Sequence, residues 1–173
     1  NNIYYVDGVN PYIIKQDLSN GSPSYDALPG IAFDLDFDEN GNLYCGGSGQ
    51  SLYRVTTDLS SSIAADYTNI SIRAIRVYNG FVYVGGNYSG TDNTVPTVGV
   101  WRNQILSSDG ALGEREIVLH WDELAGVNSN ITGITFDENG AMYISSDSNI
   151  GIGFFSEEGV FSELFPKIIS SPI

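Results

Sequence analysis

Hydrophobic and polar residues alternate over short stretches of this chain, separated by turn residues. In the clearest stretch, residues 31–37 read I-A-F-D-L-D-F, and this period of two predicts a strand with one buried face. D-E-N-G follows at 38–41 and predicts a hairpin turn, because Asp and Asn bond their own backbone and Gly41 tolerates a positive φ. Three more short strands are predicted after this turn, at residues 42–46, 51–56 and 63–68.

The strand that follows the turn is apolar on both of its faces. Leu43 and Cys45 point to one side of it and Tyr44 to the other. The same arrangement recurs later in the chain, with Val82 and Val84 around Tyr83, and with Met142 and Ile144 around Tyr143. Such a strand needs cover on both sides, which favours sheets stacked in a β-propeller. A β-sandwich would leave alternate residues solvated and is the second choice.

A tyrosine marks the same point of a repeating unit, and F-D-E-N-G itself occurs twice, at 37–41 and at 136–140. The intervals between successive tyrosines are 40, 39 and 60 residues, the last enlarged by an insertion; the tyrosines are Tyr4, Tyr44, Tyr83 and Tyr143. A period near 40 residues is typical of propeller blades. We therefore predict an all-β fold, a β-propeller built of four-stranded antiparallel blades.

The chain holds about four of these units, each expected to contain four strands. Their approximate bounds are 1–28 (lacking its first strand), 29–68, 69–125 (with the insertion) and 126–168. We expect a segment of a larger propeller, or half of a dimeric ring, rather than a four-bladed ring. The sequence H-W-D-E-L-A-G at 120–126 is the one stretch expected to form a turn of helix.

The pattern I-x-F-D-E-N-G, followed by a tyrosine and a pair of small residues, resembles the repeats of six-bladed propellers of the NHL and gluconolactonase-like kind. Residues 82–102, V-Y-V-G-G-N-Y-S-G through V-G-V-W-R, look like repeats of bacterial surface propellers. The resemblance implies the fold, and function only by analogy. Gluconolactonase-like enzymes hold a divalent metal on the propeller axis through single Glu, Asn and Asp side chains, and those positions do not map onto this chain residue by residue.

Charge and composition limit the kinds of molecule that this protein is expected to bind. Seven Lys and Arg against 21 Asp and Glu give a net charge of −14, which repels nucleic acid and anionic membranes. We therefore expect no nucleic-acid partner. We also expect no membrane insertion, because no apolar run approaches the roughly 18 to 20 residues needed to cross a bilayer. Few lysines and many Asn, Ser, Thr, Gly and Tyr are typical of extracellular or cell-surface proteins. The single Cys45 cannot form an internal disulfide and is expected to be a small core residue.

One acidic motif is a candidate cation site. Residues 36–43 match the first half of a calcium loop, with Asp36, Asp38 and Asn40 as oxygen ligands, which makes Ca²⁺ the candidate cofactor. The bidentate Glu of such a loop would fall at Gly47, so the alternative is a solvated hairpin turn. Asp34 and Asp36 are a second candidate, because they are expected to face the ring axis.

Three aromatic residues are candidates for ligand binding. Tyr88 lies in the insertion, and Trp101 and Trp121 are expected at strand ends, where flat rings can hold a sugar or a partner protein. Packing between blades is the alternative for all three. His120 is placed on an outer strand, so we expect no catalytic residue.

Two functions follow from the sequence. The first is an extracellular or cell-surface propeller that serves as a binding or assembly module without catalysis, with a protein or carbohydrate partner, and as a homo-oligomer or part of a longer chain. The alternative is a metal-dependent hydrolase of the gluconolactonase-like type with a divalent cation on the axis.

Overall fold

The structure, a computed structural model, describes residues 2–125, 129–147, 150–156 and 160–166. The all-β prediction is confirmed, since these described residues form one three-stranded and three four-stranded antiparallel sheets. The strands are β1 (Asn2–Val6), β2 (Tyr12–Asp17), β3 (Pro23–Ala27), β4 (Ala32–Phe37), β5 (Leu43–Gly47), β6 (Ser51–Val55), β7 (Ser61–Asp66), β8 (Ile70–Tyr78), β9 (Phe81–Tyr88), β10 (Val98–Ile105), β11 (Leu112–His120), β12 (Ile131–Phe136), β13 (Met142–Ser146), β14 (Ile150–Phe155) and β15 (Phe161–Pro166).

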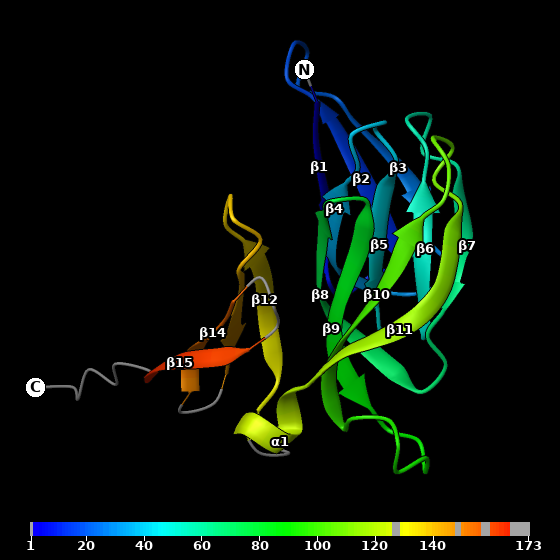
Figure 1. Cartoon of the computed structure of the whole chain (residues 1–173). Coiled ribbons are helices and arrows are strands. Elements are labelled where there is room, and N and C mark those ends of the chain that lie inside the picture. Colours follow the sequence, from blue (N-terminus) through cyan, green and yellow to red (C-terminus); the bar gives the residue numbers. More distant parts are fainter. Residues whose placement is uncertain (1, 126–128, 148–149, 157–159, 167–173) are drawn as a thin grey trace, which may run out of the picture.

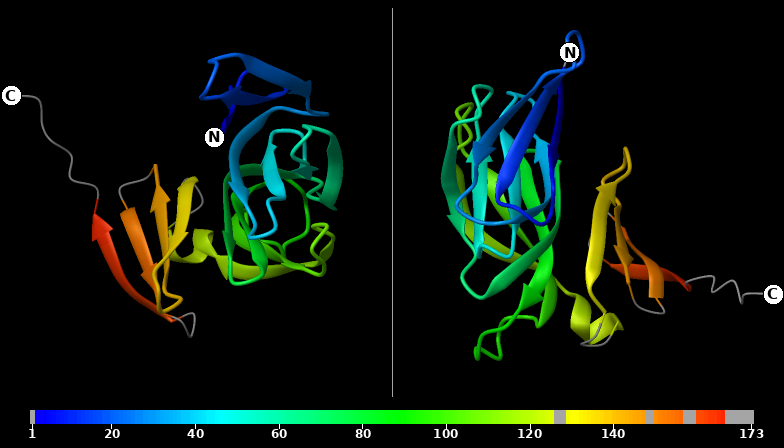
Figure 2. Two further views of the ribbon diagram at one scale, coloured as in Figure 1. Left: turned by 90° about the horizontal axis from the view of Figure 1, so that it is seen from above. Right: turned by 180° about the vertical axis from the view of Figure 1, so that it is seen from behind.

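Each sheet is a meander of strands that are consecutive in sequence. The first sheet has the order β1-β2-β3, the second β4-β5-β6-β7, the third β11-β10-β9-β8 and the fourth β12-β13-β14-β15. Figure 1 shows the sheets side by side, and Figure 2 shows them in chain order along an arc. The inner strand β8 contacts β4 on one side and β12 on the other, so the first strands of three sheets meet.

The predicted hairpin turns have the expected backbone geometry. Gly41 and Gly140 have φ values of 84° and 87°. In the first of these turns Asp38 Oδ1 accepts hydrogen bonds from the backbone N–H groups of Asn40 and Asn42, at 2.9 and 2.8 Å. Asp137 does the same for Asn139 and Ala141. The repeated F-D-E-N-G is therefore a turn whose aspartate closes the hairpin.

The recurring tyrosines and their neighbours stack the sheets on one another. We call the face that carries the tyrosine the front face of a sheet, and the opposite face its back face. Tyr44, on the front of the second sheet, lies in one buried cluster with Val82 and Val84 from the back of the third. Tyr83 likewise joins Met142 and Ile144 of the fourth sheet, and Tyr4 packs against the cluster of Leu43 and Cys45. The strands β5 and β9 are thus covered on both of their faces, as the apolar pattern around Tyr44 and Tyr83 predicts.

The predicted helical turn is confirmed as α1 (Trp121–Ala125), which follows β11 directly. Its buried Trp121 donates a hydrogen bond from Nε1 to Ser129 Oγ at 2.9 Å. Within the described ranges, no helix has the length and apolar character that crossing a membrane requires.

Candidate ligand site where the inner strands begin

The three inner strands share a β-bulge near their first residue. The pairing register skips one residue in each strand: Phe33 in β4, Arg73 in β8 and Thr132 in β12. Each skipped residue lies 10 or 11 positions before the tyrosine of its own sheet, so the three are equivalent in the repeat. Because a bulged residue is free of ladder pairing, its side chain can be aimed away from the sheet.

The bulged side chains border one cavity of about 370 Å³. We call this place the axial mouth; its lining residues are Phe33, Arg73, Asn130, Ile131, Thr132 and Asp147. The Arg73 guanidinium carbon lies 4.9 Å from the centre of the Phe33 ring, in cation–π range. Arg73 is exposed, and among the described residues it forms no ion pair. A positive charge is thus held over an aromatic ring in a chain that is otherwise strongly acidic.

Polar groups on the fourth sheet complete the mouth. Asn130 donates to the Asp147 carboxylate twice, from its backbone N–H at 2.9 Å and from Nδ2 at 2.7 Å. Its own Oδ1 accepts a hydrogen bond from Asn87 Nδ2, while the buried Asn87 Oδ1 has no partner among the described residues. Thr132 Oγ1 lies 3.0 Å from Ser145 Oγ. The mouth therefore offers a cation, a carboxylate, an amide and a hydroxyl beside one aromatic ring.

Asp34 and Asp36 connect two inner strands. Asp34 Oδ2 accepts a hydrogen bond from the backbone N–H of Ile75 at 2.7 Å, and Asp36 Oδ2 accepts one from Val77 at 2.8 Å. Arg76 Nη1 also lies 3.7 Å from Asp36 Oδ2. These carboxylates thus bind the backbone of β8, and a cation between them stays a prediction. Burial raises the pKa of Asp34 above its ordinary value of 3.8, although two backbone N–H groups oppose the shift.

This burial predicts a pH effect on stability. Because the folded-state pKa of Asp34 is raised, the folded protein holds the proton of this carboxyl more tightly than the unfolded chain does. The contribution of Asp34 to the free energy of unfolding therefore falls as pH rises from 3.8 to the folded-state pKa. Asp34→Asn should remove this decline while keeping an acceptor for Ile75. Asp34→Ala should cost about 1–3 kcal/mol by leaving that N–H unpaired. Urea unfolding at a series of pH values measures both; an unchanged pH slope in Asp34→Asn would contradict the assignment.

The residues predicted to bind calcium lie at the opposite ends of the strands from the mouth. Asp38 is buried, and its Oδ2 accepts from Asn42 Nδ2 at 2.8 Å and from the Tyr44 hydroxyl at 3.4 Å. Asp38 and Asn40 border a cavity of about 740 Å³ between three turns, and Asp36 is bound to β8 as described. Both oxygens of Asp38 are engaged in closing the turn. Within the described residues no three His, Cys, Asp or Glu side chains gather as metal ligands, and calcium here stays a prediction.

The aromatic residues predicted to bind ligand lie in three different settings. Trp101 and Trp121 are 1% and 0% exposed, inside the clusters between sheets. The alternative, packing between blades, accounts for both indoles, and we do not propose them as ligand contacts. Tyr88 is half-buried, and its hydroxyl accepts a hydrogen bond from the backbone N–H of Asp92 at 3.3 Å, so it orders the insertion. Its role in binding stays a prediction.

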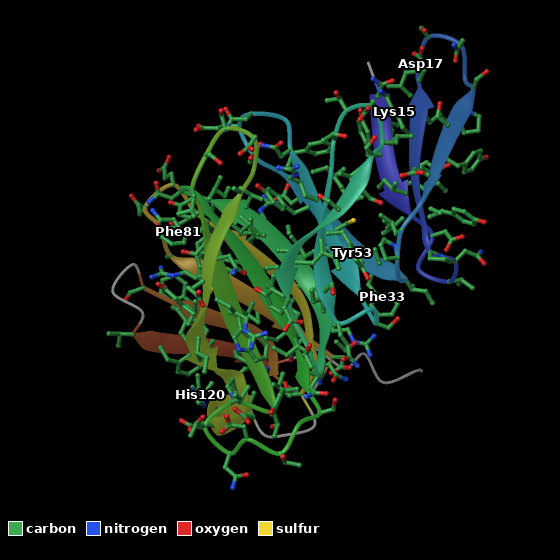
Figure 3. All side chains as sticks on the ribbon, turned by 90° about the vertical axis from the view of Figure 1, so that its right-hand side faces the viewer. Lys15, Asp17, Phe33, Tyr53, Phe81 and His120 are labelled. Atoms are coloured by element: carbon green, nitrogen blue, oxygen red, sulfur yellow. The ribbon has the colours of Figure 1, made fainter. Side chains whose placement is uncertain are left out.

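Two potential reactive groups lie away from the mouth. His120 ends the outer strand β11, where its Nδ1 is 3.6 Å from Glu123 Oε1; Figure 3 shows it well separated from Phe33. Cys45 is fully buried, and this burial raises the pKa of its thiol to about 12. At neutral pH the thiol stays protonated, as expected of a core residue.

Sequence reasoning did not find the axial mouth. Its residues Phe33, Arg73 and Thr132 differ in type, so no motif connects them. The available signal is their similar offset of 10 or 11 residues from the tyrosines, combined with the rule that bulges recur beside functional sites. Counting back 10 or 11 residues from each tyrosine would have marked all three.

Comparison with known proteins identifies the fold. No protein-family model matches the sequence, and no relative is found among curated proteins. Among solved structures, a gluconolactonase from Xanthomonas campestris is similar with a TM-score of 0.71 and 16% identity, over 96% of this chain and 59% of that one. A streptogramin B lyase is similar with a TM-score of 0.67 and 14% identity, over 98% of this chain and 52% of that one.

A third similar structure is the extracellular domain of a one-component system protein from B. thetaiotaomicron. Its TM-score is 0.59 at 13% identity, over 92% of this chain and 20% of that one. These neighbours are β-propellers of the NHL, gluconolactonase-like and streptogramin B lyase types, so the predicted propeller fold is confirmed. The chain spans between half and two thirds of the length of the first two.

Proposed function

We propose that this β-propeller chain is an extracellular or cell-surface binding module whose ligand, a hydroxylated organic anion such as a sugar acid, sits in the axial mouth. One observation carries the proposal: equivalent bulges in three sheets bring Phe33, Arg73 and Thr132 to one cavity, where the Arg73 cation forms no ion pair with any described residue.

The chemistry of the mouth matches each part of such a ligand. A carboxylate pairs with the exposed Arg73 guanidinium, in a charge-assisted hydrogen bond. The apolar face of the carbon chain covers the Phe33 ring. Ligand hydroxyls donate to the Asp147 carboxylate and bond the Asn130 amide beside it on the neighbouring sheet. A neutral sugar makes the last two contacts only. Selectivity for the acid therefore depends on Arg73.

The extracellular location is supported by the acidic, lysine-poor composition and by the extracellular domain among the similar structures. A carbohydrate partner is the one that the mouth favours; a protein partner stays the second choice. Nucleic acid is disfavoured by the net charge of −14.

A metal-dependent hydrolase is the second candidate, supported by the gluconolactonase among the similar structures. The residues that line the mouth do not fit a divalent cation well, because Arg73 brings a positive charge and Asp147 is the one carboxylate among the six. We therefore derive no step through a metal. Hydrolysis of glucono-δ-lactone by this chain in the presence of Ca²⁺ or Mn²⁺, absent without the cation, would favour the hydrolase over the binding module.

The binding proposal predicts the outcome of a titration followed by NMR. We expect D-gluconate and D-glucuronate to shift the signals of Arg73, Asn130 and Thr132 in the ¹⁵N-labelled protein, and neutral D-glucose to shift them less. Arg73→Gln should weaken gluconate binding at least about tenfold, because it removes the charge-assisted bond.

Arg115→Gln is the matched control. Arg115 is also exposed, but it lies on the outer strand β11, where it donates to the Asp66 carbonyl oxygen and covers the Tyr67 ring. It should leave gluconate affinity unchanged. Signals that shift elsewhere but not at the mouth, or an Arg73→Gln variant that binds as well as the parent, would overturn the proposal.

A further inference from the structure

At the turn end of the inner strands, a phenylalanine of one sheet packs against the repeat tyrosine of the sheet before it. The ring centre of Phe37 lies 5.1 Å from that of Tyr4, and the ring centre of Phe136 lies 4.6 Å from that of Tyr83. Each phenylalanine pairs with the residue directly before the tyrosine of its own sheet. Phe37 and Phe136 are therefore equivalent in the repeat, and each fills the space between two neighbouring sheets.

The third sheet has a valine at this position. Val77 pairs with Val82, the residue directly before the repeat tyrosine of that sheet, so it is the equivalent of Phe37. Val77 packs against the buried cluster that holds Tyr44, the tyrosine of the second sheet. A phenyl ring would contact this tyrosine if the repeat were kept. The space between the second and third sheets therefore lacks a ring that the repeat supplies on either side of it.

A cavity of about 740 Å³ opens at this place, and its volume is typical of a ligand pocket. We call it the turn cavity; it is lined by residues 37–40, 77–80 and 105–108. Leu106 is 61% exposed beside it, and Phe37 is 38% exposed. The second and third sheets each have a neighbouring sheet on both sides (Figure 2), so this exposure does not arise at an end of the arc. The turn cavity thus presents apolar side chains to solvent in the middle of the chain.

The polar part of the turn cavity is acidic. Asp38 and Glu39 contribute carboxylates to its lining, and no lysine or arginine is among the lining residues. The oxygens of Asp38 close the turn, whereas the exposed Glu39 forms no ion pair with any described residue. A cation that reaches the rim of the cavity therefore meets a carboxylate with which it can pair.

We propose that the turn cavity binds a segment of a partner protein in which a phenylalanine stands next to a lysine or arginine. Phe37 and Phe136 show which side chain is complementary to this place, because each fills the equivalent space beside another sheet. The inserted ring is the apolar anchor, since aromatic side chains give a large contact area at low entropic cost. The basic neighbour pairs with Glu39 at the rim and selects the partner by its charge.

Short peptides test the proposal in a titration followed by NMR. The probe is the blocked tetrapeptide acetyl-Gly-Phe-Lys-Gly-amide at millimolar concentration, and we expect it to shift the signals of Val77, Gly80 and Leu106 in the ¹⁵N-labelled protein. Replacing the phenylalanine of the probe by alanine should weaken binding at least about tenfold, because the ring is the anchor. Replacing its lysine by glutamate should also weaken binding, because two carboxylates then repel each other.

Val77→Phe is the sharpest variant, because it restores the residue that the repeat has at this position. It should abolish binding of the probe, while the free energy of unfolding in urea stays equal to that of the parent or rises. Glu39→Gln should weaken binding about two- to fivefold, in line with the modest contribution of an exposed ion pair.

Glu138→Gln is the matched control for the charge. Glu138 occupies the same position in the second F-D-E-N-G and is also exposed, but it lies in the turn of the fourth sheet and does not line the turn cavity. Its variant should bind the probe as the parent does. Equal losses in Glu39→Gln and Glu138→Gln would indicate a general effect of net charge and would overturn the pairing with Glu39.

The proposal fails if the probe shifts no signal at the turn cavity, or if the alanine probe binds as tightly as the phenylalanine probe. It also fails if Val77→Phe is as stable as the parent and still binds the probe. A Val77→Phe variant that is clearly less stable than the parent would show that no ring fits at this position, and this result would overturn the proposal as well.

Discussion

Trp101→Ala is expected to lower the free energy of unfolding by about 3–5 kcal/mol, the usual cost of emptying a large aromatic site in a core. Trp101 is 1% exposed on the back of the third sheet, in one cluster with Tyr44 and Leu52 from the front of the second. The cavity would open between two sheets that hold each other by such contacts. Relaxation is limited because the β-ladders fix the backbone on both sides.

Urea unfolding followed by circular dichroism measures this loss. Total stability of a domain is about 5–15 kcal/mol, so the alanine variant can fail to fold. Trp101→Phe keeps the protein in a measurable range and should lose clearly less than Trp101→Ala. If Trp101→Ala were as stable as the parent, the indole would not be packed between sheets, and a role in ligand contact would have to be considered again.

Gly47→Ala is expected to destabilise the protein by about 3 kcal/mol, at the upper end of the cost of overpacking. A Cβ at Gly47 would run into the Ile31 carbonyl oxygen and lie 2.9 Å from the Ala32 Cα. Both obstacles are backbone atoms at the start of β4, directly beside the bulge at Phe33. These two backbone atoms cannot move aside without displacing the inner strand β4, so the substitution should disturb both the bulge and the axial mouth.

Gly113→Ala provides the comparison for this substitution. Gly113 is also a strand glycine, but the nearest atom that its Cβ would meet is Leu106 Cδ2 at 3.5 Å, an ordinary contact. Its alanine variant should be neutral or slightly stabilising, because it also reduces the freedom of the unfolded chain. Thermal unfolding of the two variants side by side tests the prediction. Equal melting temperatures would show that the start of β4 is more plastic than the packing indicates.

The fold was predictable because its signals are local and repeated. Turn chemistry at Gly41 and the alternation of residues 31–37 each specify a few residues of structure. The tyrosines mark the same unit again at intervals of 40 and 39 residues, and of 60 where the insertion lies. The predicted strand at 63–68 is the least accurate, since β7 runs from Ser61 to Asp66. Outer strands have one neighbour and a solvated face, so their pattern constrains the ends less.

The site was harder to predict, because it depends on which way individual side chains point. Asp34 and Asp36 are predicted to face the axis, and this stays a prediction; the sequence pattern did not indicate that their carboxylates accept hydrogen bonds from the backbone of the next inner strand. For Trp101 and Trp121 the sequence allows either ligand binding at strand ends or packing between blades, and in the structure both are core residues. A bulge shifts which side chains of a strand point to each face of the sheet, and no local sequence pattern predicts where a bulge occurs.

The three bulges have a consequence for how this chain can change over time. At each bulge the apolar residue before the bulged one is buried in the core; these residues are Ala32, Ile72 and Ile131. The bulged residue itself has no partner in the register of the sheet. Phenylalanine, arginine and threonine already occupy the equivalent positions. Substitutions at these positions can therefore change the chemistry of the mouth one side chain at a time, while the packing between the sheets stays the same.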